Sequence, residues 1–199
     1  MFKVLSGSIT DSAVKRGAVK PEDREETVYG INTLLTVGVN IISALLIGLI
    51  FNMVIEIILF LVIYKQLRKY TGGIHANNAL NCYISSCITY IAALVCIRYY
   101  DVPGSVTTVL VLCSSAVLWI LAPIEAKNKP LDELERMVFR RRSHIMIIVC
   151  FAVFAALHYI PVLKAYSAVA AISIYTVAIF AVLGKISIAR YHQKQQHNL

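Results

Sequence analysis

Apolar stretches of about 20 residues follow one another along this chain, and their length constrains the fold more than any other feature. A helix of about 20 apolar residues crosses a hydrocarbon core roughly 30 Å thick. With 58% apolar and 15% charged residues, the composition is not that of a soluble domain. Six stretches are candidates to span a bilayer: 31–51, 53–64, 79–97, 105–124, 145–163 and 166–183. We therefore predict an all-α integral membrane protein with about six transmembrane helices.

The second stretch is the shortest of the six. It has only 12 residues and contains Glu56, so it crosses only if Lys65 and Arg68 extend their charged ends to the surface or the bilayer thins. Otherwise it is re-entrant beside the first helix. A four-helix core with a short or re-entrant hairpin is the alternative.

Lys and Arg residues are concentrated in alternate connecting segments. Of the 19 in the chain, five precede residue 31, three lie in 65–78, six in 125–144 and three after 184, which leaves only Arg98 and Lys164 elsewhere. The positive-inside rule then places both termini in the cytoplasm. The net charge of +8 thus reflects anchoring on an anionic leaflet, and we do not predict nucleic-acid binding.

The chain divides into consecutive parts of a single membrane domain, 1–199. Phe2, Leu5 and Ile9 share one helical face in the N-terminal segment, which predicts an amphipathic helix on the inner leaflet or, as the sharper alternative, an arm that binds a partner. The parts are a cytoplasmic interfacial segment (1–30), a first helical hairpin (31–64), a polar loop and helix start (65–82), helices 3 and 4 (79–124), a cytoplasmic loop (125–144), helices 5 and 6 (145–184) and a cytoplasmic tail (185–199).

The densest polar cluster lies at a membrane boundary, in residues 65–82. Gly72 and Gly73 permit a sharp turn or the close approach of an extended peptide. Cys82 falls in the first turns of the third stretch, where free backbone N–H groups and the positive end of a helix favour a thiolate and can hold an oxyanion. An imidazolium such as that of His75 would favour the thiolate further. This pattern is compatible with a cysteine nucleophile.

A non-catalytic interpretation of the same residues is also possible. His75 and Cys82 are seven residues apart, so on one continuous helix they would lie roughly 10 Å apart along the axis. Catalysis requires the chain near Gly73 to fold back, or a pair formed across a subunit boundary. Otherwise Cys82 is a small residue at a helix start and His75 an interfacial side chain. One His and one Cys do not supply the four ligands of a structural zinc, so no metal is predicted.

Four motif positions resemble a known family. Arg68, Gly73, His75-Ala76 and Cys82 match the pattern R-x4-G-x-H-A-x5-C of the AgrB family of accessory gene regulator membrane proteases. Chain length, hydropathy profile and the segments 122–125 and 128–131 are also similar to that family. The resemblance covers about residues 25–190.

The resemblance implies a function. Members of this family are cysteine endopeptidases of the bacterial plasma membrane that remove the C-terminal tail of an AgrD-like quorum-sensing precursor and support its cyclisation to a thiolactone or lactone. They act at the cytoplasmic side, form homodimers and need no cofactor. Here Cys82 would be the nucleophile and His75 the general base, with Arg68, Gly73, Asn77 and Asn81 in substrate binding or support. The sequence does not assign a third residue that orients His75 among Asn77, Asn78 and Asn81.

Two other functions are compatible with the chain. A peptide or small-molecule transporter would tolerate loss of Cys82 but depend on intramembrane polar residues such as Glu56 or Asn40. A membrane scaffold would tolerate both changes. Substitution of Cys82 therefore separates the three hypotheses.

Overall fold

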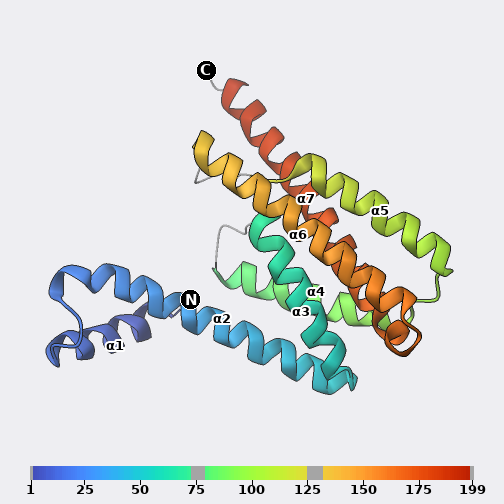
Figure 1. Ribbon diagram of the computed structural model, residues 1–199. Helices are drawn as coiled ribbons and strands as arrows, with labels where there is room; N and C mark the ends of the chain where they lie inside the picture. The colour runs from blue at the N-terminus through green and yellow to red at the C-terminus, as the bar shows by residue number, and fades with distance from the viewer. Residues whose placement is uncertain (1, 73–78, 125–131, 198–199) are drawn as a thin grey trace.

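A computed structural model describes residues 2–72, 79–124 and 132–197 of the chain, and side chains up to residue 190. The described residues are helical almost throughout, as predicted (Figure 1). The elements are α1 (Lys3–Lys15), η1 (Pro21–Asp23), α2 (Arg24–Phe51), α3 (Val54–Thr71), α4 (Ala79–Arg98), α5 (Gly104–Leu121), α6 (Glu133–Tyr159), η2 (Pro161–Tyr166) and α7 (Ser167–His197).

Within the described residues, five helical segments are long and apolar enough to cross a membrane. They are Pro21–Phe51, Ala79–Arg98, Gly104–Leu121, Glu133–Tyr159 and Pro161–Arg190. This confirms the prediction of a multi-pass helical membrane protein. The predicted count of six stays a prediction, because α3 has 18 residues but also carries Glu56, Lys65, Arg68 and Lys69.

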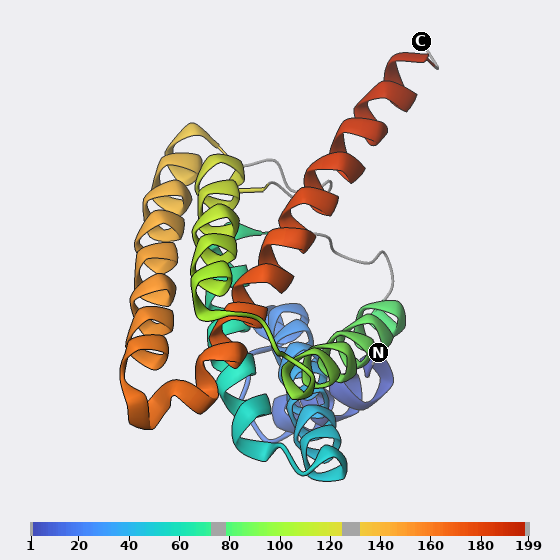
Figure 2. The ribbon, with the colours of Figure 1, turned by 90° about the vertical axis from the view of Figure 1, so that its right-hand side faces the viewer.

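Helices α3 and α7 form the centre of the bundle. Helix α7 packs on α3, α4, α5 and α6, and α3 packs on α2, α4, α6 and α7. Figure 2 shows α5 and α6 side by side, with α7 crossing the bundle and extending beyond its other helices. Helix α6 continues without a break from the charged residues after Asp132 into the apolar stretch. The basic residues Arg140, Arg141 and Arg142 therefore belong to the same rigid element as the span.

A tight turn joins α2 to α3. Helix α2 ends at Phe51, and the next residue, Asn52, has a φ of 54° in the left-handed region. The N–H of Met53 donates to the carbonyl oxygen of Gly48 at 2.8 Å. A Cβ atom on Gly48 would lie 2.5 Å from Cγ2 of Ile57. The absence of a side chain at Gly48 thus allows the two helices to approach closely.

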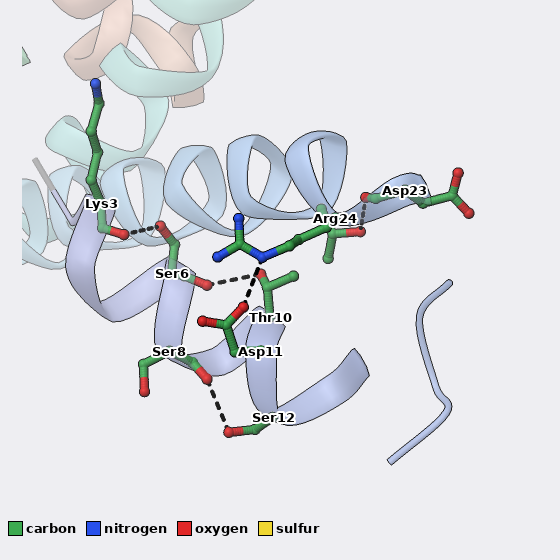
Figure 3. A network of polar contacts seen from close by, with 9 residues as sticks. Lys3, Ser6, Ser8, Thr10, Asp11, Ser12, Asp23 and Arg24 are labelled. Carbon is green, nitrogen blue, oxygen red and sulfur yellow. Dashed lines mark hydrogen bonds and ion pairs between the residues drawn. The ribbon is translucent and has the colours of Figure 1, made fainter. Parts of the chain in front are cut away.

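The α1 helix packs on α2 through small polar residues, and α1 and the N-terminal part of α2 project from the rest of the bundle (Figure 1). Ser6 and Thr10 are fully buried, and their hydroxyls donate to the carbonyl oxygens of Lys3 and Ser6 (Figure 3). Arg24 pairs with Asp11 at 2.8 Å. Leu5 and Ile9 remain about half exposed, so α1 keeps the predicted apolar face available; its location on the inner leaflet stays a prediction.

Candidate functional site

The candidate site begins where α3 ends. Gly72 has a φ of +78°, and its N–H donates to the carbonyl oxygen of Arg68 at 3.1 Å, which closes the last turn of the helix. A positive φ strains residues that carry a Cβ. Gly72 thus adopts a backbone conformation of the kind that glycine permits, while Gly73 lies outside the described residues.

The end of α3 is fixed by two contacts with distant parts of the chain. The hydroxyl of Ser143, on α6, donates to the carbonyl oxygen of Tyr70 at 2.6 Å. The N–H of Ile124 donates to the carbonyl oxygen of Thr71 at 2.9 Å. A Cβ atom on Gly72 would collide with the carbonyl oxygen of Ile124. Both contacts satisfy carbonyls that a helix end leaves open, so the last described turn before the polar loop has a fixed position.

Arg68 projects from this last turn into an aromatic environment. Its guanidinium donates a hydrogen bond to the phenol oxygen of Tyr64, four residues earlier on α3. The guanidinium carbon lies 5.5 Å from the ring centroid of Tyr64 and 4.9 Å from that of Phe180 on α7. These distances are typical of cation–π contacts. Arg68 is therefore oriented by two rings as well as by a hydrogen bond.

The rings that hold Arg68 continue into the core. Tyr64 stacks on Phe60 with centroids 5.2 Å apart, and Phe60 contacts Tyr90 of α4 edge-on at 6.5 Å. Phe60, Tyr64 and Tyr90 are all buried. Because this cluster joins α3, α4 and α7, it makes the position of Arg68 depend on the packing of three helices.

Cys82 lies in the first described turn of α4, on the other side of the polar loop, and its side chain is exposed. The start of α4 borders residues 73–78, outside the described residues, so the predicted role of Cys82 at a helix start stays a prediction. The phenol of the next residue, Tyr83, and the hydroxyl of Ser43 on α2 are 2.7 Å apart, which ties this turn to α2. Asn81 is also exposed in the same turn.

Arg68, in the last turns of α3, and Cys82, in the first described turn of α4, lie on either side of residues 73–78 in the sequence. His75, Asn77 and Gly73 lie outside the described residues, so their predicted roles stay predictions.

The sequence interpretation did not identify Tyr64, Phe180 or Ser143. Tyr64 carries a local signal, because residues four apart on a helix are neighbours and Arg68 is in the motif. No local signal marks Phe180 or Ser143, which reach the end of α3 from α7 and α6 only in the folded chain.

Of the residues named for the transporter hypothesis, Glu56 lies at the far end of α3 from Arg68, and Asn40 lies on α2 one turn before Ser43. In the first turn of α3 the Glu56 carboxylate complements the helix dipole. The Asn40 amide donates to the carbonyl oxygen of Thr36 at 3.2 Å. Among residues 2–72, 79–124 and 132–197, no group of three or more His, Cys, Asp or Glu side chains could hold a metal ion.

The fold and the candidate site define a class: a multi-pass helical membrane protein with an exposed cysteine in the first described turn of α4 and an arginine held at the end of α3. Residues 6–187 match the family model described as Accessory gene regulator B, and the chain belongs to this AgrB family. Family membership is consistent with a role in processing the accessory gene regulator quorum-sensing peptide, and it implies association with an AgrD-like precursor and with the membrane.

Two curated proteins from Clostridium perfringens are similar to the chain. An AgrB-like protein of strain SM101 is 25% identical over 158 residues, and AgrB-like protein 2 of strain 13 is 26% identical over 158 residues. Each alignment covers 76% of this chain and 74% of the relative. No solved structure matches the chain.

Proposed function

We propose that this protein is a membrane cysteine endopeptidase that removes the C-terminal tail of an AgrD-like peptide precursor and supports its cyclisation. The observation that carries the proposal is the position of Cys82, exposed in the first described turn of α4, which Tyr83 ties to α2. Family membership supplies the substrate class.

In the proposed reaction Cys82 attacks the scissile carbonyl carbon while His75 takes the thiol proton. N–H groups at the start of α4 stabilise the oxyanion. The C–N bond then breaks, and the leaving amine of the tail receives the proton from His75. A thioester joins the remaining peptide to Cys82. An internal Cys or Ser of the peptide attacks this thioester, which releases Cys82 and closes a thiolactone or lactone.

Arg68 in this proposal fixes a positive charge beside the nucleophile. Tyr64 and Phe180 are positioning residues, since they contact Arg68 and not the reacting atoms. Asn81, exposed one residue before Cys82, and Asn77 are proposed to orient His75, and Gly73 to leave space for the peptide backbone.

We further propose that the site faces the cytoplasm and that both termini lie there. Ser143 of α6 contacts Tyr70 of α3, so the basic starting segment of α6 and the basic last turn of α3 meet at one end of the bundle. Basic ends of membrane helices favour the cytoplasmic side. A homodimer in the plasma membrane also belongs to the proposal, on the basis of family membership alone.

The decisive experiment incubates the purified full chain in lipid vesicles with an AgrD-like precursor and follows precursor mass and the enzyme adduct by mass spectrometry. Cys82→Ala and His75→Ala are expected to lower cleavage by about a thousandfold or more. Cys87→Ala and Cys96→Ala, on the same helix, are the matched controls and should cleave normally. Persistent cleavage by Cys82→Ala would falsify the proposal and favour a transporter.

A second experiment tests the positioning of Arg68. Arg68→Gln should lower kcat for precursor cleavage about tenfold or more with little change in KM, whereas Lys69→Gln, the exposed neighbour, should cleave normally. Tyr64→Phe should lower kcat about tenfold with little change in KM, because small displacements of catalytic groups are costly. Unchanged cleavage by Arg68→Gln removes Arg68 from this role.

A further inference from the structure

A cavity lies at the end of the bundle where α5 ends and α6 begins. Its volume is about 490 Å³, within the range of pockets that hold small molecules. Residues 120–124 form one wall, and Ile188 and Ala189 of α7 contribute a second apolar surface. The cavity is lined by Arg136, Arg140 and Lys185 as well.

The three basic residues reach the cavity from two helices. Arg136 and Arg140 are four residues apart on α6, so their side chains leave the same face of the helix. Lys185 comes from α7, after the last apolar turns of its span. Arginine and lysine side chains donate charge-assisted hydrogen bonds to anions. A cavity that three of them line therefore favours a ligand with at least one negative charge.

The apolar part of the lining narrows the class of ligand. Ile120, which lines the cavity, is 76% exposed and belongs to a helix long and apolar enough to cross a membrane. A small inorganic anion would leave this wall uncovered. An anionic phospholipid satisfies both halves of the lining, because its phosphate meets the cations while its glycerol and first methylene groups cover the apolar wall.

We propose that this cavity is a binding site for the headgroup of an anionic phospholipid. The Arg136 and Arg140 guanidinium groups bind the phosphate oxygens, for which the planar fork of arginine is well suited. Lys185 supplies a third charge from the opposite helix. Basic pockets between membrane helices recognise phospholipid headgroups by the same physics.

The site adjoins the segment that holds the end of α3. Residues 122–124 line the cavity, and Ile124 in the same segment donates its N–H to Thr71. The lipid would thus contact chain that packs against the start of the polar loop. Lipid binding does not require Cys82 to be catalytic, so the lipid site can be tested independently of the proposed peptidase activity.

Native mass spectrometry of the purified full chain tests the site. The protein is titrated with phosphatidylglycerol and, separately, with phosphatidylcholine in a non-ionic detergent. Wild type should retain phosphatidylglycerol preferentially. Arg136→Gln with Arg140→Gln should weaken retention about 25-fold, since each basic residue at an anionic surface contributes roughly a factor of five.

Two variants and two competitors make the result specific. Arg141→Gln with Arg142→Gln removes the same charge from neighbouring positions of α6 outside the cavity lining, and should retain the lipid. Arg136→Lys with Arg140→Lys keeps the charge and should lose less than the Gln pair. Equal losses in the 136/140 and 141/142 pairs, or no preference for phosphatidylglycerol, overturn the proposal. So does displacement of the lipid at equal concentration by inorganic phosphate or by an acidic peptide, which would assign the cavity to that competitor.

Discussion

Helices α2 and α3 form one hairpin but have opposite surroundings. Helix α2 is strongly apolar, and only Ala44 and Gly48 are buried along its 28 residues. Helix α3 carries four charged residues in 18 positions, yet seven of its residues are buried. The more polar helix is therefore the one inside the protein.

The difference shows which solvent stabilises each helix. Lipid solvates the side chains of α2, so they need no protein partner. The charged residues of α3 lie near its ends, and the stretch between them packs on α4, α6 and α7. Substitutions should therefore affect stability strongly in α3 and weakly in α2, and they can be ranked by expected size.

The largest effect is expected from a matched pair of leucines. Leu67 in α3 is 1% exposed, whereas Leu49 in α2 is 62% exposed. Leu67→Ala should lower the free energy of unfolding by about 2–5 kcal/mol through the cavity it leaves. Leu49→Ala should change it by about 0.5 kcal/mol or less. Unfolding in mixed micelles, followed by circular dichroism, measures both free energies. Equal losses would show that α3 is no more important to stability than α2.

Glycines give the next contrast. Gly72→Ala places a Cβ at a positive φ and against the Ile124 carbonyl, which should cost about 2 kcal/mol or more. At Gly38 in α2, a Cβ would meet nothing within 4 Å among the described residues. Gly38→Ala should thus be neutral or stabilising by up to about 1 kcal/mol. The same unfolding measurement applies; a neutral Gly72→Ala would show that the end of α3 can move.

A smaller effect is expected where α6 holds the end of α3. Ser143→Ala removes the fully buried hydroxyl that donates to Tyr70 and should cost about 1–2 kcal/mol. Ser12→Ala removes an exposed hydroxyl in α1 that donates to the Ser8 carbonyl oxygen, with an expected cost below about 0.5 kcal/mol. If the two serines prove equivalent, the contact from α6 does not fix α3.

The smallest effect concerns the exposed ion pair between α1 and α2. The Arg24 guanidinium, through its hydrogen bond to Asp11, holds the pKa of that carboxyl below its usual 3.8. The contribution of the pair is therefore fully present above pH 3.8 and is lost as pH falls through the lowered pKa. Hydrogen exchange in α1 should accelerate slightly over that acidic range in wild type. Asp11→Asn should show no such step; a step in both variants would implicate another group.

Part of the candidate site could be predicted from the sequence. The polar cluster between two apolar stretches indicated Arg68 and Cys82, and the motif around them indicated the AgrB family. The conformational freedom of glycine permitted a turn at Gly72, and the start of the third apolar stretch predicted a helix start near Cys82. Tyr64, Phe180 and Ser143 could not be assigned to the site, because each depends on which helices pack against the end of α3.

The sequence by itself determined that this protein is helical and spans a membrane, because apolar length and the distribution of charge act locally along the chain. Only the tertiary structure decided that α3 lies inside the bundle while α2 faces outward, since an apolar stretch can be covered by lipid or by protein. It also decided which distant residues hold Arg68 and which cations share a cavity. Those relations depend on helix packing, and packing is a property of the whole chain.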